Sequence, residues 1–260
     1  MNWRLGVAGS PVLHSLSPQL HDAGLRIAGL SGTSSRVELP LERASELPQL
    51  LGEDFDALSV TSPLKYAAFA LCDEVSDVAR RTESVNSLRM LDGRLSGIST
   101  DGDGLVSAVE GAFGSVVANA HVVVLGAGGA ASAIVDALVR SEAASVVVHG
   151  RTQSNVDALT QRYTNVHSSS LVYRPIDLII NTVPVHGRNS EAAVLQGVRP
   201  DTIAVDITYD PRDTEWRQRY DASGCRTMNG LAMLAYQAAL QMRWWWGVTL
   251  EGADLLEVLV

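Results

Sequence analysis

Short strand-like runs alternate with helical stretches along the first hundred residues of the chain. The strand-like runs cover residues 4–9, 35–39 and 55–61, and the helical stretches cover 16–30, 41–51 and 63–75. Apolar residues spaced three and four apart indicate amphipathic helices, whereas short β-rich runs bounded by turn residues indicate strands. This βαβαβα order predicts a mostly parallel sheet with right-handed crossovers, whose strands end along one edge.

A second alternation follows residue 101. Before it, residues 84–91 and 93–100 are predicted to form an antiparallel pair, joined by the turn residues Asp92 and Gly93. After it, four apolar runs are predicted to be buried strands of a nucleotide-binding sheet: 121–126, 144–150, 176–182 and 202–208. The predicted fold class is therefore α/β, with an N-terminal α/β domain and a Rossmann-type dinucleotide-binding domain.

The last clear helix, over residues 230–248, is too apolar to lie free in water. Trp244, Trp245 and Trp246 step about 100° apart around it, so the aromatic rings need cover on more than one side. We expect this helix to leave the second domain and pack on the first. The predicted domains are residues 1–101 with 238–260, and residues 102–237.

Composition narrows the class of partner. The chain has 260 residues, is 46% hydrophobic and carries a net charge of −9, which opposes binding to nucleic acid or anionic membranes and favours a small-molecule partner. Cys72 and Cys225 lie far apart, and the N-terminus lacks a signal-peptide pattern, so we expect a cytoplasmic protein. No apolar run reaches membrane-spanning length and the histidines lack metal-ligand spacing, so neither a membrane nor a metal is expected.

The sequence contains a single lysine, Lys65, beside 19 arginines. An ammonium group can lose its proton in a suitable site, whereas a guanidinium stays protonated. Lys65 is therefore a candidate proton-transfer group. The alternative is one leftover surface lysine in an arginine-rich chain.

A glycine-rich turn follows the strand predicted at 121–126 and opens a helix. Its residues are Gly126, Ala127, Gly128, Gly129 and Ala130. Glycines at the turn allow a pyrophosphate to approach the backbone, and the helix N-terminus attracts its charge. The next predicted strand is followed by Arg151 and by no carboxylate, which favours the 2′-phosphate of NADP over the ribose hydroxyl of NAD. An ordinary surface arginine is the alternative.

Taken together, these motifs resemble the shikimate dehydrogenase family over essentially the whole chain. The motifs are GSPVLHSLSPQLHDA, VTSPLK, SVNSL, STDGDGL, GAGGAA, GRT and NGLAMLAYQA. The resemblance implies that Lys65 and Asp101 form the catalytic pair. It implies a substrate carboxylate bound by Ser15 and Ser17, with ring hydroxyls bound by Thr61, Asn86 and Gln237. It makes residues 1–101 with 238–260 the substrate-binding catalytic domain and residues 102–237 the NADP-binding domain. Tyr209 is a candidate further contact, with turn packing beside Pro211 as its alternative. The implied NADP-binding residues are Gly126, Ala127, Gly128, Gly129, Ala130, Arg151, Thr152, Thr182 and Gly230.

Several departures from the family pattern stand out. The family often has a second basic residue shortly after the cofactor arginine, where this chain has Gln153, Ser154 and Asn155, so weaker phosphate binding is expected. Ser99 stands where an asparagine often precedes the TDG triplet, and residues 180–187 depart from the usual INATxxG. None of these changes removes a proposed catalytic group.

The implied activity is the reversible reduction of 3-dehydroshikimate to shikimate with NADPH, on the route to chorismate and the aromatic amino acids. A Lys and Asp pair suits this chemistry, because ketone reduction needs a proton for the developing alkoxide. Alternatives are a quinate or aminoshikimate dehydrogenase of the same family and a non-catalytic NADP-binding regulator. A monomer or a homodimer is expected. For the individual residues the alternatives are structural: helix caps for Ser15, Ser17 and Asp101, turn satisfaction for Asn86, and an exposed helix position for Gln237.

Overall fold

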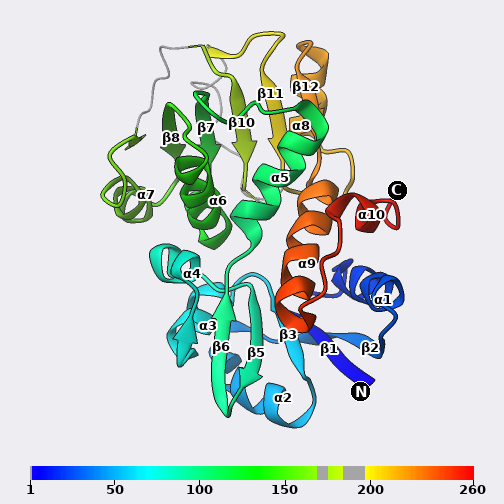
Figure 1. Cartoon of the computed structure of the whole chain (residues 1–260). Helices are drawn as coiled ribbons and strands as arrows, with labels where there is room; N and C mark the ends of the chain where they lie inside the picture. The colour runs from blue at the N-terminus through cyan, green and yellow to red at the C-terminus, as the bar shows by residue number, and fades with distance from the viewer. Residues whose placement is uncertain (1, 169–174, 184–196) are drawn as a thin grey trace. The chain divides into compact units, whose positions relative to one another are not determined.

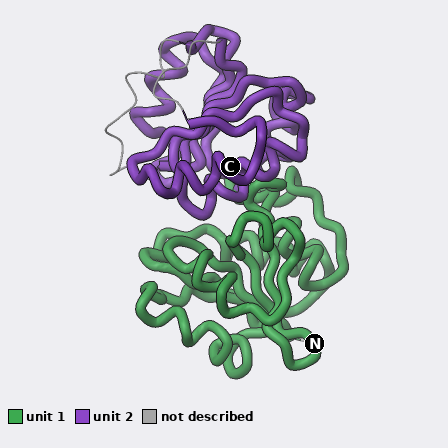
Figure 2. Tube along the Cα trace, turned by 90° about the vertical axis from the view of Figure 1, so that its left-hand side faces the viewer, with its two compact units in different colours: residues 1–104, 234–260 green, residues 105–233 purple. Residues whose placement is uncertain are grey.

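A computed structural model describes residues 2–168, 175–183 and 197–260 of the chain. The chain divides into two compact units, shown in Figure 2. Unit 1 comprises Met1–Gly104 and Leu234–Val260, and unit 2 comprises Leu105–Met233. Our sequence boundaries fall a few residues away, after 101 and 237, and the functions assigned to the two domains stay predictions.

Unit 1 is built on a mixed six-stranded sheet in the order β2-β1-β3-β5-β6-β4. Its strands are β1 (Asn2–Gly9), β2 (Ser31–Glu38), β3 (Ala57–Val60), β4 (Glu74–Val75), β5 (Ser87–Leu91) and β6 (Arg94–Ile98). Strand β1 pairs in parallel with β2 and β3, while β5 pairs antiparallel with β3 and β6. The predicted parallel start and antiparallel close of this sheet are both present.

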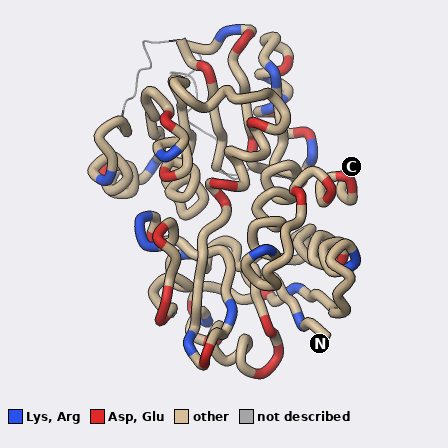
Figure 3. Tube along the Cα trace, viewed as in Figure 1, with Lys and Arg blue, Asp and Glu red and all other residues tan. Residues whose placement is uncertain are grey.

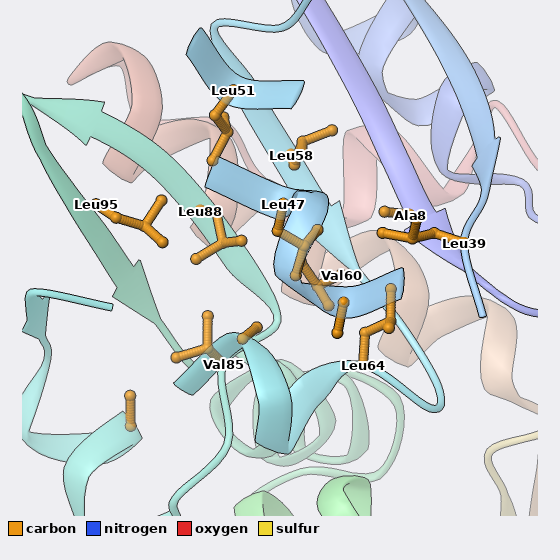
Figure 4. Packing of buried hydrophobic residues seen from close by; sticks show 13 residues of the cluster. Ala8, Leu39, Leu47, Leu51, Leu58, Val60, Leu64, Val85, Leu88 and Leu95 are labelled. Atoms are coloured by element: carbon orange, nitrogen blue, oxygen red, sulfur yellow. The ribbon is translucent and has the colours of Figure 1, made fainter. Parts of the chain in front are cut away.

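The helices of unit 1 include the three predicted from apolar spacing. They are α1 (Ser17–Ile27), a 3₁₀ turn (Leu41–Glu46) continued by α2 (Leu47–Glu53), α3 (Lys65–Leu71), α4 (Asp77–Thr82) and α10 (Gly252–Leu256). The stretch predicted as one helix over 63–75 ends at Leu71, because Cys72 is extended and the short strand β4 follows. Leucine and valine side chains from α2, β3, β5 and β6 form the core beneath these elements (Figure 4).

Unit 2 contains an all-parallel six-stranded sheet in the order β12-β11-β10-β7-β8-β9 (Figure 1). Its strands are β7 (His121–Leu125), β8 (Ser145–His149), β9 (Val166–Ser168), β10 (Leu178–Asn181), β11 (Ile203–Asp206) and β12 (Arg226–Met228). Helices α5 (Asp101–Phe113), α6 (Gly129–Arg140), α7 (Gln153–Thr160) and α8 (Glu215–Ala222) accompany them. The four predicted strands form the centre of the sheet, and the sequence missed the two edge strands of three residues each.

Helix α9 (Gly230–Trp246) returns to unit 1, as predicted from its apolar composition. Trp245 is buried with its ring edge-on to His21, and Trp246 packs against Trp3. The Arg89 guanidinium lies over the ring of Trp244. The three tryptophans thus find cover on different sides of the helix.

Charged residues of both signs are interspersed along each unit (Figure 3). Within the part of the chain that the structure describes, no helix combines the length and apolar character that crossing a membrane requires.

Candidate active site

The loops after β1 and β3 lie side by side, because these parallel strands are neighbours in the sheet. The backbone N–H of Ser10 donates to the Ser62 carbonyl at 3.0 Å, and that of Thr61 donates to the Ala8 carbonyl at 2.9 Å. A Cβ at Gly9 would lie 2.3 Å from the Thr61 methyl carbon, so only glycine permits this approach. The loop of residues 10–16, here called the serine loop, and the segment leading to Lys65 therefore meet at one edge of unit 1.

Lys65 and Asp101 form an ion pair at this edge. Lys65 begins α3 and Asp101 begins α5, and the Lys65 Nζ donates to Asp101 Oδ2 at 2.6 Å. Their side chains are 15% and 7% exposed, so the pair is largely shielded from water but still reachable. A short charge-assisted hydrogen bond in such surroundings can hold and release a proton. Lys65 is not a leftover surface lysine.

Asn86 joins this pair to the returning helix. Its Nδ2 lies 2.9 Å from Asp101 Oδ1 and 3.2 Å from Gln237 Oε1, while its Oδ1 accepts from the Thr100 backbone N–H at 2.9 Å. The amide thus satisfies some turn backbone, as the alternative held, and also contacts two further candidate site residues. The Asp101 carboxylate faces Lys65 and Asn86.

Gln237 lies on the buried side of α9 and is 6% exposed, which excludes an exposed helix position. Its Nε2 donates to the Leu234 carbonyl at 2.8 Å. A Cβ at Gly104 would lie 2.7 Å from the Gln237 backbone, so α5 and α9 approach closely only because that position is glycine.

Ser15 and Ser17 are both buried near the start of α1. The Ser15 hydroxyl accepts from the Ser17 backbone N–H at 3.2 Å, so it serves in part as the helix-start group that we considered as an alternative. Arg36 donates two hydrogen bonds to the Ser15 carbonyl, at 2.9 and 2.6 Å. Thr61, half-buried, lies at the end of β3.

The glycine-rich turn of unit 2 follows β7. Gly126 has a φ of +111°, and a Cβ there would lie 2.1 Å from Thr182 Oγ1, so the turn requires glycine. Thr182 donates its hydroxyl hydrogen to the Leu125 carbonyl at 2.8 Å. This bond ties the turn to the end of β10.

The N-terminus of α6 follows the glycine-rich turn directly. Gly128 is the N-cap, no side chain caps the helix, and its first turn carries no acidic residue. A Cβ at Gly128 would meet no described atom within 4 Å, whereas Ala131 is fully buried. Ala127, Gly129 and Ala130 are half-buried around this opening. The backbone N–H groups of a helix start and the helix dipole fit the pyrophosphate of a dinucleotide.

Arg151 is exposed two residues after β8, and Thr152 is the N-cap of α7. The guanidinium has no hydrogen bond or ion pair with any residue that the structure describes. Among those residues, none competes with a ligand for this guanidinium.

Two further predicted residues belong to unit 2. Tyr209 follows β11 and is half-buried. Gly230 begins α9, where a Cβ would lie 1.9 Å from the Ile207 carbonyl oxygen, so the structure gives this glycine a packing reason. Ligand contacts for both stay predictions, and Pro184–Gly187 of the INTVPVHG stretch lie outside the described residues.

The sequence analysis missed two groups of polar residues. Thr100 is 4% exposed and bonds both Asn86 and the Gln237 carbonyl. In unit 2, the fully buried Asp206 accepts from Thr214 Oγ1 at 2.6 Å and from Asn181 Nδ2 at 3.1 Å. For Asn181 and Asp206 the sequence did hold a signal, because each is a polar residue at the end of an apolar strand, in residues 178–181 and 203–206.

An all-parallel sheet with a glycine-rich turn, together with a buried Lys and Asp pair, defines the class of dinucleotide-dependent dehydrogenases. Family models agree: residues 7–88 match the shikimate dehydrogenase substrate binding domain, and residues 108–219 match shikimate / quinate 5-dehydrogenase. The shikimate dehydrogenase (NADP(+)) of Exiguobacterium is 34% identical, with 98% of each chain covered. The chain belongs to the shikimate dehydrogenase family.

Two other relatives agree. The shikimate dehydrogenase (NADP(+)) of Pyrococcus abyssi is 36% identical, with 94% of this chain and 92% of that protein covered. Among solved structures, shikimate 5-dehydrogenase from Thermus thermophilus in complex with NADP(H) and shikimate is 32% identical. The TM-score is 0.88, with 98% of each chain covered.

Proposed function

We propose that this protein is an NADP-dependent shikimate dehydrogenase, which reversibly reduces 3-dehydroshikimate to shikimate. The observation that carries the proposal is the Lys65 and Asp101 ion pair, joined by Asn86 to Gln237. Full-length relatives with this activity in their names support it. The activity belongs to the biosynthesis of aromatic amino acids.

When bound, the nicotinamide of NADP would supply the hydride for reduction of the ketone, or accept it in the reverse direction. Lys65 Nζ donates a proton to the oxygen on which negative charge develops, and takes it back during oxidation. Asp101 holds the ammonium group in position and stabilises its charge. Arginine in place of Lys65 would keep the charge but release its proton reluctantly.

Substrate recognition in this proposal rests on the remaining polar groups of unit 1. Ser15 and Ser17 bind the carboxylate, and Thr61, Asn86 and Gln237 bind the ring hydroxyls. Asn86 and Gln237 are buried, which makes recognition of the ring selective, because an analogue that lacks a hydroxyl leaves them unpaired. Tyr209 is a further candidate contact.

The cofactor residues lie in unit 2. The turn from Gly126 to Ala130 and the N-terminus of α6 receive the pyrophosphate, since they offer N–H groups and the first turn of α6 carries no acidic residue. Arg151 grips the 2′-phosphate, and Thr152, Thr182 and Gly230 complete the predicted set.

A direct assay tests the proposal. Purified protein is incubated with shikimate and NADP, and the absorbance of the reduced cofactor is followed, with quinate and NAD in parallel reactions. We expect reduction with shikimate and NADP. Faster turnover of quinate would support the related dehydrogenase, for which the matched family description leaves room. NADP binding without turnover of either substrate would identify a non-catalytic regulator.

Two properties of the proposed enzyme rest on the sequence expectations. A cytoplasmic location is proposed because the matched family is biosynthetic, and the free Cys72 and Cys225 agree with it. The oligomeric state, monomer or homodimer, is measured by light scattering of the purified chain.

A further inference from the structure

A buried chain of polar side chains leads from β2 to the backbone of Asn86. The Ser34 hydroxyl lies 2.7 Å from His21 Nδ1, and His21 Nε2 lies 3.1 Å from the Ser59 hydroxyl. Ser59 donates to Gln241 Oε1 at 2.6 Å, and Gln241 Nε2 donates to the Asn86 carbonyl at 3.0 Å. The proposed reaction uses none of these side chains, yet the hydrogen-bond chain ends at Asn86, which is proposed to bind the substrate.

The donors and acceptors available determine the direction of every hydrogen bond in this hydrogen-bond chain. A serine hydroxyl has one hydrogen, and Ser59 gives its hydrogen to Gln241, so Ser59 accepts from His21 Nε2–H. The neutral imidazole then accepts at Nδ1 from Ser34. Burial lowers the pKa of His21 to about 3, which keeps the ring neutral near neutral pH.

Most side chains of this hydrogen-bond chain are buried. His21 is 0% exposed, Gln241 1% and Ser59 4%. The Trp245 ring, one turn beyond Gln241 on α9, stands edge-on to His21 with centroids 5.2 Å apart. Because a buried donor or acceptor left without a partner is costly, breaking one bond of the chain disturbs its neighbours.

Two glutamines one helical turn apart thus contact Asn86. Gln237 lies at the side-chain amide, and Gln241 bonds the backbone carbonyl. Side chains four residues apart lie on the same helix face, so both contacts depend on the same position and rotation of α9. The Asn86 amide in turn lies 2.9 Å from the Asp101 carboxylate.

We propose that Gln241, Ser59 and His21 are positioning residues of the shikimate site, which hold Asn86 in the orientation that binds substrate. This inference rests on the proposed function, since it names the supports of that same site. The hydrogen-bond chain does not include the bond between Lys65 and Asp101. Breaking the hydrogen-bond chain should therefore affect substrate binding more than proton transfer.

The test compares Gln241→Met and Ser59→Ala with wild type. Methionine keeps the length of glutamine without its hydrogen bonds, and alanine removes only the hydroxyl. We expect the KM for shikimate to rise about tenfold in each single variant, the scale of one buried hydrogen bond. The kcat should fall less than about threefold and the KM for NADP should stay within about twofold.

The double variant tests whether the two residues act as one unit. Because both substitutions break the same chain, Gln241→Met with Ser59→Ala should raise the KM for shikimate no further than the worse single variant. Ser96→Ala is the matched control. Ser96 is 5% exposed on β6 of the same sheet, and its hydroxyl has no hydrogen-bond partner among the described residues. Its kinetics should match wild type.

Each outcome is decisive. Thermal unfolding verifies that each variant is folded, and Gln241→Met carries the test alone should Ser59→Ala not fold. If folded Gln241→Met has an unchanged KM for shikimate, with or without a lower melting temperature, the hydrogen-bond chain serves packing alone and the inference is wrong. Turnover of shikimate by wild type would still support the proposed function in that case. Multiplying effects in the double variant also overturn it. Wild type inactive with shikimate overturns the proposed function and this inference with it.

Discussion

At the scale of single residues, Lys65 carries the strongest prediction because it is the only lysine of the chain and pairs with Asp101. Lys65→Ala should lower kcat by roughly 10² to 10⁴, the usual contribution of a positioned acid or base. The affinity for NADP should stay nearly unchanged, because the predicted cofactor residues lie in the other unit. Steady-state kinetics and cofactor titration measure both quantities.

Lys65→Arg is the sharper variant, since it retains the charge beside Asp101 but releases a proton only reluctantly. It should also turn over poorly. Near-wild-type kcat in this variant would show that charge alone is needed and that Lys65 transfers no proton.

Arg151 determines cofactor choice in our proposal. A charge-assisted hydrogen bond is worth about 1.5–3 kcal/mol, so one arginine supplies on the order of a 10- to 150-fold preference for NADP over NAD. The missing second basic residue favours the lower part of that range. Arg151→Ala should weaken NADP binding with little effect on NAD, and Arg151→Asp should go further by repelling the phosphate.

Dissociation constants for both cofactors in the three proteins measure this preference. Arg199→Ala is a suitable control, because Arg199 is another exposed arginine of unit 2 that pairs with Asp177 and Asp201. Equal binding of NAD and NADP by wild type would make Arg151 an ordinary surface arginine.

At the scale of elements, strand β2 supports the serine loop. Glu38 Oε2 accepts from the Val12 backbone N–H at 3.1 Å, and Arg36 bonds the Ser15 carbonyl. Glu38→Ala should raise the KM for shikimate severalfold with little change in kcat, because the loop that carries Ser15 and leads to Ser17 loses a hydrogen bond. Glu42→Ala, an exposed glutamate outside β2, should have no effect. An unchanged KM for shikimate in Glu38→Ala would show that β2 does not support the substrate site.

The same contact has a defined pH dependence. Hydrogen bonds from the Ser10 side chain and the Val12 backbone lower the pKa of Glu38. A lowered folded-state pKa contributes stability above the ordinary glutamate pKa of about 4.3, and this contribution is lost as pH falls through the folded-state value. The stability advantage of wild type over Glu38→Gln should therefore be constant near neutral pH and vanish in acid. Denaturant unfolding at several pH values measures it.

At the scale of the whole molecule, two helices belong to both compact units. Helix α5 begins in unit 1 and continues into unit 2, and α9 begins in unit 2 and continues into unit 1. Unfolding either unit would break a helix of the other, so we expect one cooperative transition. Either ligand should raise the free energy of unfolding, by about 2.7 kcal/mol at a hundredfold excess over its Kd.

Calorimetric melting with shikimate alone and with NADP alone tests this coupling. The ligands should move the same transition. Two transitions, each shifted by one ligand, would show that the units unfold independently.

Local patterns were sufficient for much of the molecule. Apolar spacing predicted the βαβαβα order, the four central strands of unit 2 and the return of α9, because periodicity reports which face of an element is buried. It missed β4, β9 and β12, since strands of two or three residues are too short to show a period. The glycine-rich turn was readable because Gly126 needs a positive φ, a property of its own backbone.

The sequence by itself determined the class of the fold, the glycine turn and the candidate residues, since each depends on residue type or on spacing within one element. Only the tertiary structure decided which of these side chains meet. Asn86 and Gln237 are 151 positions apart, and Ser59 and Gln241 are 182 apart, so no local period connects them. Their contacts exist because α9 buries its apolar face on unit 1 and the polar groups carried inside must then pair with one another.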